Sequence, residues 1–231
     1  MTGITPAEID AILLSLRVAA WSVAGSLPFA IACAWVLARL EFPGKPVFDA
    51  IVHLPLVMPP VVIGYLLLIT LGTRGPVGGF LHQVFGIKLI FTSAGAAVAS
   101  AVMAFPLMVR AIRLSLEAID RGLEDAARTL GAGRLDLFAT ITLPLMLPGL
   151  LAGAVIAFAA SLGEFGATIT FVSNIPGETR TLPLAIYTAT QTPDGDAIAA
   201  RLAGLAFALA IAGLALSEWL ARRVRLMLGQ R

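Results

Sequence analysis

Charged residues are scarce in this sequence. Only 13% of its 231 residues are Asp, Glu, Lys or Arg, whereas 58% are hydrophobic and the mean hydropathy is +0.93. A soluble domain usually carries about 25% charged residues. So much apolar surface has too little polar cover for water, and a bilayer is the expected solvent. The length suits one domain, residues 1–231.

The residue types that build catalytic, metal and disulfide sites are also rare. Cys33 is the lone cysteine, which excludes an internal disulfide and a cysteine-based metal site. The two histidines, His53 and His82, form no HExxH pattern, and no Walker A loop is present. A net charge of +2 without interleaved aromatic and basic residues argues against nucleic acid as a partner. We therefore predict a protein that is not an enzyme, with no catalytic residue, metal ligand or bound cofactor.

Long uncharged stretches predict membrane-spanning helices, because crossing the hydrocarbon core takes about 20 apolar residues. Four such stretches cover residues 18–38, 50–73, 89–109 and 137–163. A fifth helix fits residues 197–220 if Arg201 and Glu218 reach the interfaces. Helices are favoured because every backbone amide in lipid needs an internal partner. We predict an all-α integral membrane protein of about five spans, residues 10–38, 50–72, 89–112, 142–165 and 197–220.

The basic residues predict an orientation. If the N-terminus lies outside and the C-terminus in the cytoplasm, the inner segments hold Arg39, Lys45, Arg110, Arg113, Arg121, Arg128, Arg134, Arg222, Arg223, Arg225 and Arg231. The outer segments then hold only Arg74, Lys88, Arg180 and Arg201. Basic residues favour the cytoplasmic side, so this topology is preferred to its inverse.

Two of the predicted spans carry helix-breaking residues. Pro55, Pro59 and Pro60 interrupt the second span, and Gly163 and Gly166 lie at the end of the fourth. Proline removes a helical hydrogen bond, which a membrane tolerates only where neighbours or a cavity satisfy the freed carbonyl. Packing geometry and a pore-lining role are both open for these breaks.

The loop between the third and fourth spans, residues 116–141, has helical periodicity. Apolar residues recur on one face at Ile119, Leu123, Ala126, Ala127 and Leu130. Gly131 and Gly133 then end the helix, and residues 135–140 form a second short helical stretch. Periodicity alone leaves open a surface helix without any partner.

The same loop resembles the cytoplasmic signature of permeases from ATP-binding-cassette importers. That signature reads Glu-Ala-Ala, three residues, Gly, nine residues, then Ile-x-Leu-Pro. The matching positions here are Asp125, Ala126, Ala127, Gly131, Ile141, Leu143 and Pro144. The one departure is Asp125, where the family usually has Glu. The charge is kept and the reach is shorter by one methylene.

This resemblance implies a fold like that of type I importer permeases and a coupling role for the loop. In that family the loop is the coupling helix, which docks on a separate ATPase subunit. Small Ala126 and Ala127 would allow close approach to the partner, and Gly131 would permit a sharp turn. Asp125 would cap the helix or pair with a basic group across the interface. ATP would be bound by the partner ATPase.

The resemblance extends along the whole chain and is closest to the molybdate branch. It is carried by residues 53–65, 161–168 and 174–187, the last containing Thr-Leu-Pro-Leu-Ala-Ile-Tyr. It implies a homodimer in the bacterial inner membrane, with two ATPase subunits inside, a periplasmic molybdate-binding protein outside, and import by alternating access. Tungstate permeases, and sulfate or thiosulfate permeases, remain alternatives. A membrane assembly protein without transport is a rival from another class.

Candidate pathway residues cluster at the outer end of the fourth span. Neutral donors that could pass an oxyanion are Ser161, Thr168, Thr170, Ser173 and Asn174. Local back-bonding to the helix is the simpler use of such side chains. Glu164 would repel an anion. We therefore expect Arg17 either to pair with Glu164 or to face the outer vestibule, because both lie at similar depth.

Overall fold

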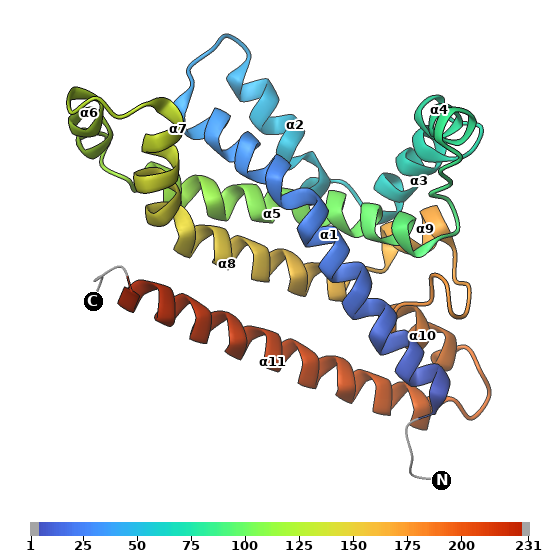
Figure 1. Cartoon of the computed structure of the whole chain (residues 1–231). Helices are drawn as coiled ribbons and strands as arrows, with labels where there is room; N and C mark the ends of the chain where they lie inside the picture. Colours follow the sequence, from blue (N-terminus) through green and yellow to red (C-terminus); the bar gives the residue numbers. More distant parts are fainter. Residues whose placement is uncertain (1–4, 228–231) are drawn as a thin grey trace.

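The hydrophobic segments form helices in the computed structural model, which describes residues 5–227 (Figure 1). No strand occurs among these described residues. The helices are α1 (Pro6–Arg39), α2 (Lys45–Val57), α3 (Pro60–Leu71), α4 (Pro76–Phe85), α5 (Ser93–Glu117), α6 (Arg121–Thr129), α7 (Arg134–Leu137), the π-helical turn η1 (Phe138–Thr142), α8 (Leu143–Leu162), α9 (Gly166–Val172), α10 (Leu182–Thr190) and α11 (Asp196–Met227).

Four helical stretches are long and apolar enough to cross a membrane. They are α1, α5, the continuous helix Arg134–Leu162, and Asp196–Gly213 within α11. The bent pair α2 and α3 makes a fifth if it counts as one span, with an angle of 112° between its halves. The prediction of an all-α membrane protein with about five spans is therefore confirmed. The second of these spans is not one straight helix.

Helix α1 begins earlier than the predicted residue 10. Thr5 is its N-cap, and Thr5 and Glu8 form a reciprocal capping box. The Thr5 N–H donates to Glu8 Oε2 at 2.6 Å, and Pro6 occupies the first helical position, where no N–H is needed. The cap therefore extends α1 four residues beyond the predicted span, into a segment that carries Glu8 and Asp10.

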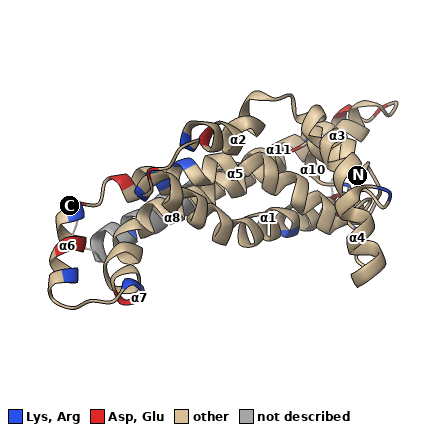
Figure 2. Ribbon diagram, turned by 90° about the horizontal axis from the view of Figure 1, so that it is seen from above, with Lys and Arg blue, Asp and Glu red and all other residues tan. Residues whose placement is uncertain are grey.

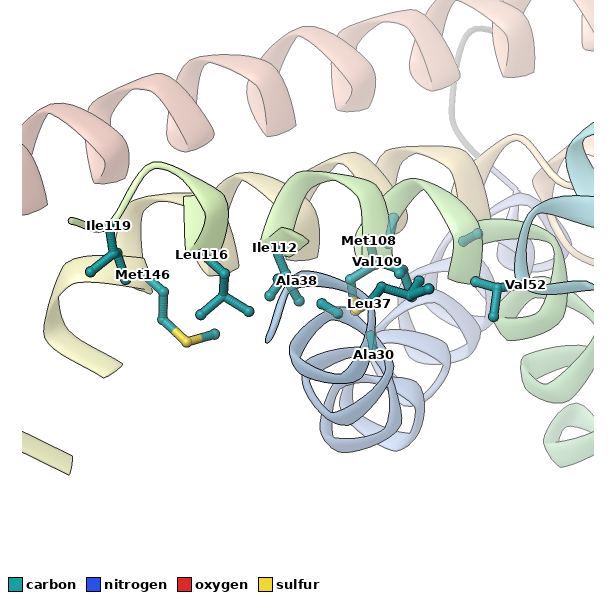
Figure 3. Packing of buried hydrophobic residues seen from close by; sticks show 13 residues of the cluster. Ala30, Leu37, Ala38, Val52, Met108, Val109, Ile112, Leu116, Ile119 and Met146 are labelled. Carbon is teal, nitrogen blue, oxygen red and sulfur yellow. The ribbon is translucent and has the colours of Figure 1, made fainter. Parts of the chain in front are cut away.

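The largest hydrophobic cluster joins α1, α5 and α8. Figure 3 shows Leu37, Met108 and Met146 from the three helices within it. Two glycines allow the close approach of α8 to α5. A Cβ on Gly149 would collide with Ser115, and one on Gly153 would lie 3.1 Å from the Met108 carbonyl oxygen. Small residues at such a crossing are typical of membrane helices.

Two smaller clusters lie toward the other end of α1. One joins Leu14 and Val18 of α1 to Ile63 of α3 and Phe171 of α9. The other joins Ala11 of α1 to Leu182, Ala185 and Leu202, from α10 and α11. Each end of α1 is thus packed against a different set of helices.

Charged residues gather toward the ends of the long helices. Figure 2 shows them around α6 and α7 and at the opposite end near α3 and α4, with most of the middle uncharged. This distribution suits helices whose middle portions lie in hydrocarbon, where charge is costly.

Candidate functional site

Helix α6 contains the first part of the predicted coupling signature, and its two ends are built by local rules. The Asp120 side chain caps the start by accepting from the Gly122 N–H at 2.8 Å. At the other end, the Gly131 N–H donates to the Arg128 carbonyl and the Ala132 N–H to the Ala127 carbonyl, each at 3.0 Å. These two bonds form a Schellman motif. Gly131 has φ +91°, so the predicted sharp turn is present.

The face of α6 that packs on the rest of the chain is not the predicted apolar stripe. Leu123 and Leu130 are 51% and 89% exposed, whereas Glu124 and Ala127 are buried. Of the two signature alanines, only Ala126 lies on the exposed side. Ala127 faces its own chain, and its predicted contact with a partner stays a prediction. The exposed leucines offer apolar surface that this chain leaves uncovered.

A single carboxylate joins α6 to two other elements. The Glu124 Oε1 atom accepts a hydrogen bond from Arg39 Nη2 at 2.9 Å and another from Thr142 Oγ1 at 3.0 Å. The Arg39 and Glu124 side chains are each 9% exposed. Arg39 ends α1, and Thr142 ends η1. The position of α6 is therefore fixed relative to both α1 and α8 through one buried oxygen atom.

Sequence reasoning did not select Arg39, Glu124 or Thr142 as a group. One local signal was available, since Glu124 and Ala127 lie three residues apart and so share a helix face. The partner Arg39 lies 85 positions from Glu124, and no local pattern reaches that far.

The other charges of α6 stay closer to the surface. Asp125, the signature acid, pairs with Arg128 at 2.7 Å, and both side chains are more than half exposed. Arg121 Nη2 lies 3.4 Å from the Ala38 carbonyl oxygen at the end of α1. Beyond α1, exposed Glu41 accepts from Lys45 at 2.7 Å, which lowers the pKa of Glu41. Asp125 therefore makes its ion pair within the helix and remains accessible to a partner.

A groove of about 1260 Å³ lies between the Arg39 half of α1 and the α6–α7 segment. Arg39, Arg121, Glu124 and Arg134 line it, beside apolar side chains that include Trp35. The groove shows that α6 does not pack flush on α1. The buried Glu124 contacts therefore cross an otherwise open junction.

The second part of the signature lies where α7 passes into α8. The expected short helical stretch at residues 135–140 is present and continues without a break into α8 as one helix, Arg134–Leu162. Residues Phe138–Thr142 form a π-helical turn that contains Ile141, and the Leu143 N–H bonds to the Phe138 carbonyl. Pro144 has no N–H to continue the regular pattern, which explains an irregular turn here. Ile141, Leu143 and Pro144 are all partly buried.

The two broken helices meet each other away from α6. The chain bends between α2 and α3 at Met58 and Pro59, and α8 is separated from α9 by Gly163, Glu164 and Phe165. A Cβ on Gly166 would lie 2.7 Å from the Pro60 Cβ atom, and one on Gly64 would lie 2.7 Å from the Ala167 carbonyl oxygen. Glycine at both positions therefore permits the α3–α9 contact. The predicted breaks at Pro59 and Pro60 and at Gly163 and Gly166 are confirmed, whereas Pro55 lies inside α2 and does not end it. The packing of the two breaks on each other is new.

Glu164 has a different role from the predicted one. Its Oε1 atom accepts from the Ala167 N–H at 2.8 Å at the start of α9. Arg17 is exposed on α1, and the described ion pairs do not include Arg17 with Glu164. The predicted pairing is wrong, because the backbone of α9 supplies the hydrogen-bond donor. The alternative, that Arg17 faces a vestibule, stays a prediction.

Most of the candidate oxyanion donors already make hydrogen bonds within the chain. Ser161 shares a 2.9 Å hydrogen bond with Ser22 of α1, and Thr170 bonds back to the Gly166 carbonyl at 2.8 Å. Asn174 donates to Thr188 at 2.8 Å and accepts from Arg180 at 2.9 Å.

The remaining two candidates differ, since Thr168 is buried and Ser173 is exposed. The Thr168 hydroxyl is buried and makes no hydrogen bond within the described chain. Ser173 has φ +64°, and its carbonyl accepts from Thr179 at 3.1 Å. The role of the five candidates in a pathway stays a prediction.

Comparisons with known proteins agree with this architecture. Residues 26–226 match the family described as binding-protein-dependent transport system inner membrane component. The molybdenum transport system permease protein ModB of Escherichia coli strain K12 is 61% identical over 219 residues, which cover 95% of this chain and 96% of that protein. The Haemophilus influenzae protein of the same name is 59% identical over 223 residues, covering 96% of this chain and 97% of that protein.

The fold also matches solved transporters. A bacterial ABC transporter involved in the import of the acidic polysaccharide alginate aligns with a TM-score of 0.76 at 20% identity. The alignment covers 95% of this chain and 80% of the transporter chain. The resemblance confirms the predicted importer-permease fold.

Proposed function

Because this chain belongs to the family of binding-protein-dependent transport system inner membrane components, we propose that it is the permease subunit of an ATP-driven importer of molybdate. The observation that carries the proposal is 61% identity to a molybdenum permease over 95% of the chain. The chain would supply the membrane path. ATP would be bound and hydrolysed by a separate subunit.

The geometry of α6 supports the coupling part of this proposal. A nine-residue helix stands out from the body with Leu123, Asp125 and Leu130 exposed. Apolar side chains beside charged ones suit a protein interface whose core is hydrophobic and whose rim is polar. An ATPase subunit docked on this surface could move α6 as it closes, and the buried face of α6 would pass the movement to the spans.

The proposed topology places α6 and the Arg39 end of α1 in the cytoplasm. Lys and Arg are more frequent in the segments at that end, as the positive-inside rule requires. The start of α1 would then lie outside, with the C-terminus in the cytoplasm. The assembly would be a homodimer with two ATPase subunits inside and a molybdate-binding protein outside. Dimers of identical chains related by a two-fold axis are the commonest homo-oligomers.

Uptake by the reconstituted complex tests the proposed function. The permease, its ATPase and its binding protein are placed in proteoliposomes with ATP inside, and labelled molybdate is supplied with the binding protein outside. We expect ATP-dependent uptake that excess tungstate reduces strongly and excess sulfate reduces little. Equal uptake of sulfate would overturn the substrate assignment. Absence of any ATP-dependent oxyanion uptake would overturn the importer assignment itself.

A further inference from the structure

We propose that Arg39, Glu124 and Thr142 are positioning residues that make α6 move as one unit with α1 and α8. This inference rests on the proposed importer function and adds a transmission element to it. Displacement of α6 by the ATPase would reach the end of α1 through Arg39 and the start of α8 through Thr142. Transport would then depend on a buried contact made within the permease chain itself.

The contact pattern around Glu124 supports this role. One carboxylate oxygen receives hydrogen bonds from α1 and from η1, at 2.9 Å and 3.0 Å. A third charge, Arg128 of α6 itself, lies 4.0 Å from the other oxygen. Hydrogen bonds to a charged group are shorter and stronger than neutral ones. The two strong contacts point to different helices, so one atom of α6 links both.

Burial makes this link harder to break than a surface ion pair. Arg39 and Glu124 side chains are each 9% exposed, whereas the nearby Lys45–Glu41 pair includes a Glu41 side chain that is 85% exposed. Exposed pairs contribute little because water and salt screen them. Removing one member of a buried pair instead leaves an uncompensated charge, which is strongly unfavourable. Arg39 and Glu124 are therefore expected to stay together when α6 moves.

The surroundings of α6 offer few substitutes for this link. The groove beside α1 separates much of α6 from that helix, and Leu123 and Leu130 are exposed. Besides the Glu124 contacts, Arg121 reaches the Ala38 carbonyl only at 3.4 Å. Among the described contacts, the Glu124 carboxylate is thus the shortest polar connection between α6 and the long helices.

The Thr142 end of the link reaches an irregular segment of helix. Thr142 closes the π-helical turn that leads into α8, directly before the Leu143–Pro144 pair of the signature. Such turns often occur at functional positions in helices. A pull on Thr142 would act where the helical hydrogen bonding is already interrupted, while α8 beyond it is packed on α5.

The number of molybdate ions imported per ATP hydrolysed tests the proposal. Reconstituted complexes carrying Arg39→Ala, Glu124→Ala or both are compared with the unaltered complex, each normalised to assembled complex. We expect the ions imported per ATP to fall by about 10-fold in each single variant while ATP hydrolysis continues. The double variant should be no worse than either single one, because the two residues act as a unit.

Milder variants cover the case in which the alanine variants do not assemble. Thr142→Val removes one hydrogen bond and keeps the side-chain shape, and Glu124→Gln keeps an acceptor without the charge. Both should lower the ratio by about threefold. Glu41→Gln, which breaks the exposed pair at the same end of the molecule, is the matched control and should leave the ratio unchanged.

A distance measurement separates transmission from simple stabilisation. Spin labels are placed at Leu40→Cys, just beyond α1, and Thr129→Cys, at the end of α6, in a Cys33→Ser background. With doubly labelled chains diluted by unlabelled ones in the proposed homodimer, we expect one narrow intrachain distance distribution that is the same with and without ATP. In the Thr142→Val and Glu124→Gln backgrounds the distribution should broaden or change with ATP.

Two results would overturn the link without touching the proposed function. One is an unchanged number of ions per ATP in all assembled variants, and the other is an unchanged label distance in them. Failure of the unaltered complex to import molybdate would instead contradict the proposed function. The two failures are therefore distinguishable in the same preparation.

Discussion

Each end of α1 carries an ion pair with a buried carboxylate, and α1 supplies the acid at its start and the base at its end. At its start, Glu8 Oε1 accepts from Arg201 of α11 through Nε at 2.9 Å and Nη2 at 2.7 Å. At its end, Arg39 donates to Glu124 of α6 at 2.9 Å. The Glu8 side chain is 5% exposed, close to the 9% of Glu124. The local chemistry is similar, but the elements that the pairs connect differ greatly.

The Glu8–Arg201 pair joins two long helices that are also held by a hydrophobic cluster around Ala11 and Leu202. The Arg39–Glu124 pair holds a nine-residue helix that contributes only Ala127 to the buried apolar residues. Hydrophobic burial stabilises in proportion to the area removed from water. An ion pair added to a large hydrophobic contact contributes stability to that contact. An ion pair that is nearly the sole attachment of a small helix instead determines the position of that helix. We call the Glu8–Arg201 pair the clamp, because it adds stability to a contact that already exists. We call the Arg39–Glu124 pair the transmission point, because it fixes the position of α6.

The substitution with the largest expected effect on uptake lies at the end of α6. This helix has little hydrophobic contact with the rest of the chain that could keep it in place if its last turn were disrupted. Gly131→Pro cannot adopt φ +91° and removes the N–H that bonds to the Arg128 carbonyl. We predict loss of molybdate uptake with membrane insertion retained, measured by uptake and by the amount of protein in the membrane fraction. Gly133→Ala is the control, because Gly133 has φ −70° and open space around its Cα. Uptake by Gly131→Pro equal to that of the control would contradict the importance of this turn.

The next effect compares the two acids directly. Glu124→Ala should reduce the ions imported per ATP by about 10-fold, whereas Glu8→Ala should leave that ratio unchanged in the complex that assembles. Glu8→Ala should instead lower stability by about 1–2 kcal/mol, because it removes the ion pair with the partly exposed Arg201 and the Thr5 capping box. Thermal unfolding of the detergent-purified complex gives the second quantity. A fall in the ratio for Glu8→Ala would erase the distinction between clamp and transmission point.

A smaller contrast involves one hydrogen bond at each end. Ser15 Oγ accepts from the Leu182 N–H at 2.6 Å, which fastens α10 to α1 near its start. Ser15→Ala leaves that buried N–H without its acceptor and should cost about 1–3 kcal/mol in stability. Thr142→Val should cost less stability and yet lower the ions imported per ATP. Measuring unfolding and uptake on both variants sharpens the comparison, and the reverse pattern would refute it.

The smallest effect is expected at the exposed pair. Glu41→Gln removes the ion pair with Lys45, where the Glu41 side chain is 85% exposed. The stability of this variant should stay close to that of the unaltered complex, and uptake should not change. A loss as large as that of Glu124→Ala would mean that charge near the end of α1, and not the buried contact, controls coupling.

Local rules predicted much of the fold from the sequence. Residues 10–38 and 197–220 lie within α1 and α11, because a long and mostly apolar stretch has helix as its stable form in lipid. Pro59 and Gly163–Gly166 mark real breaks, because proline and glycine act on their own backbone. The turn at Gly131 follows from the same local cause.

The predictions about which side of a helix faces which neighbour depended on residues distant along the chain. Ala127 faces inward and Leu123 outward, because Glu124 is held by Arg39 and turns that face of α6 toward α1. Arg17 does not pair with Glu164, because the α9 backbone supplies a nearer donor. Similar depth along two helices gave no information about which sides of those helices face each other.

Taken alone, the amino-acid sequence determined that the chain lies in a membrane, where its helices lie and where they break. It also determined the spacing of the coupling signature. Each of these features depends on residues within a few turns of one another. Only the tertiary structure decided that Glu124, one position before the signature, is the residue that ties the loop to α1 and α8. The physical reason is that a buried charge stays where distant groups compensate it, and Arg39 is brought there by the packing of α1 on α5 and α8.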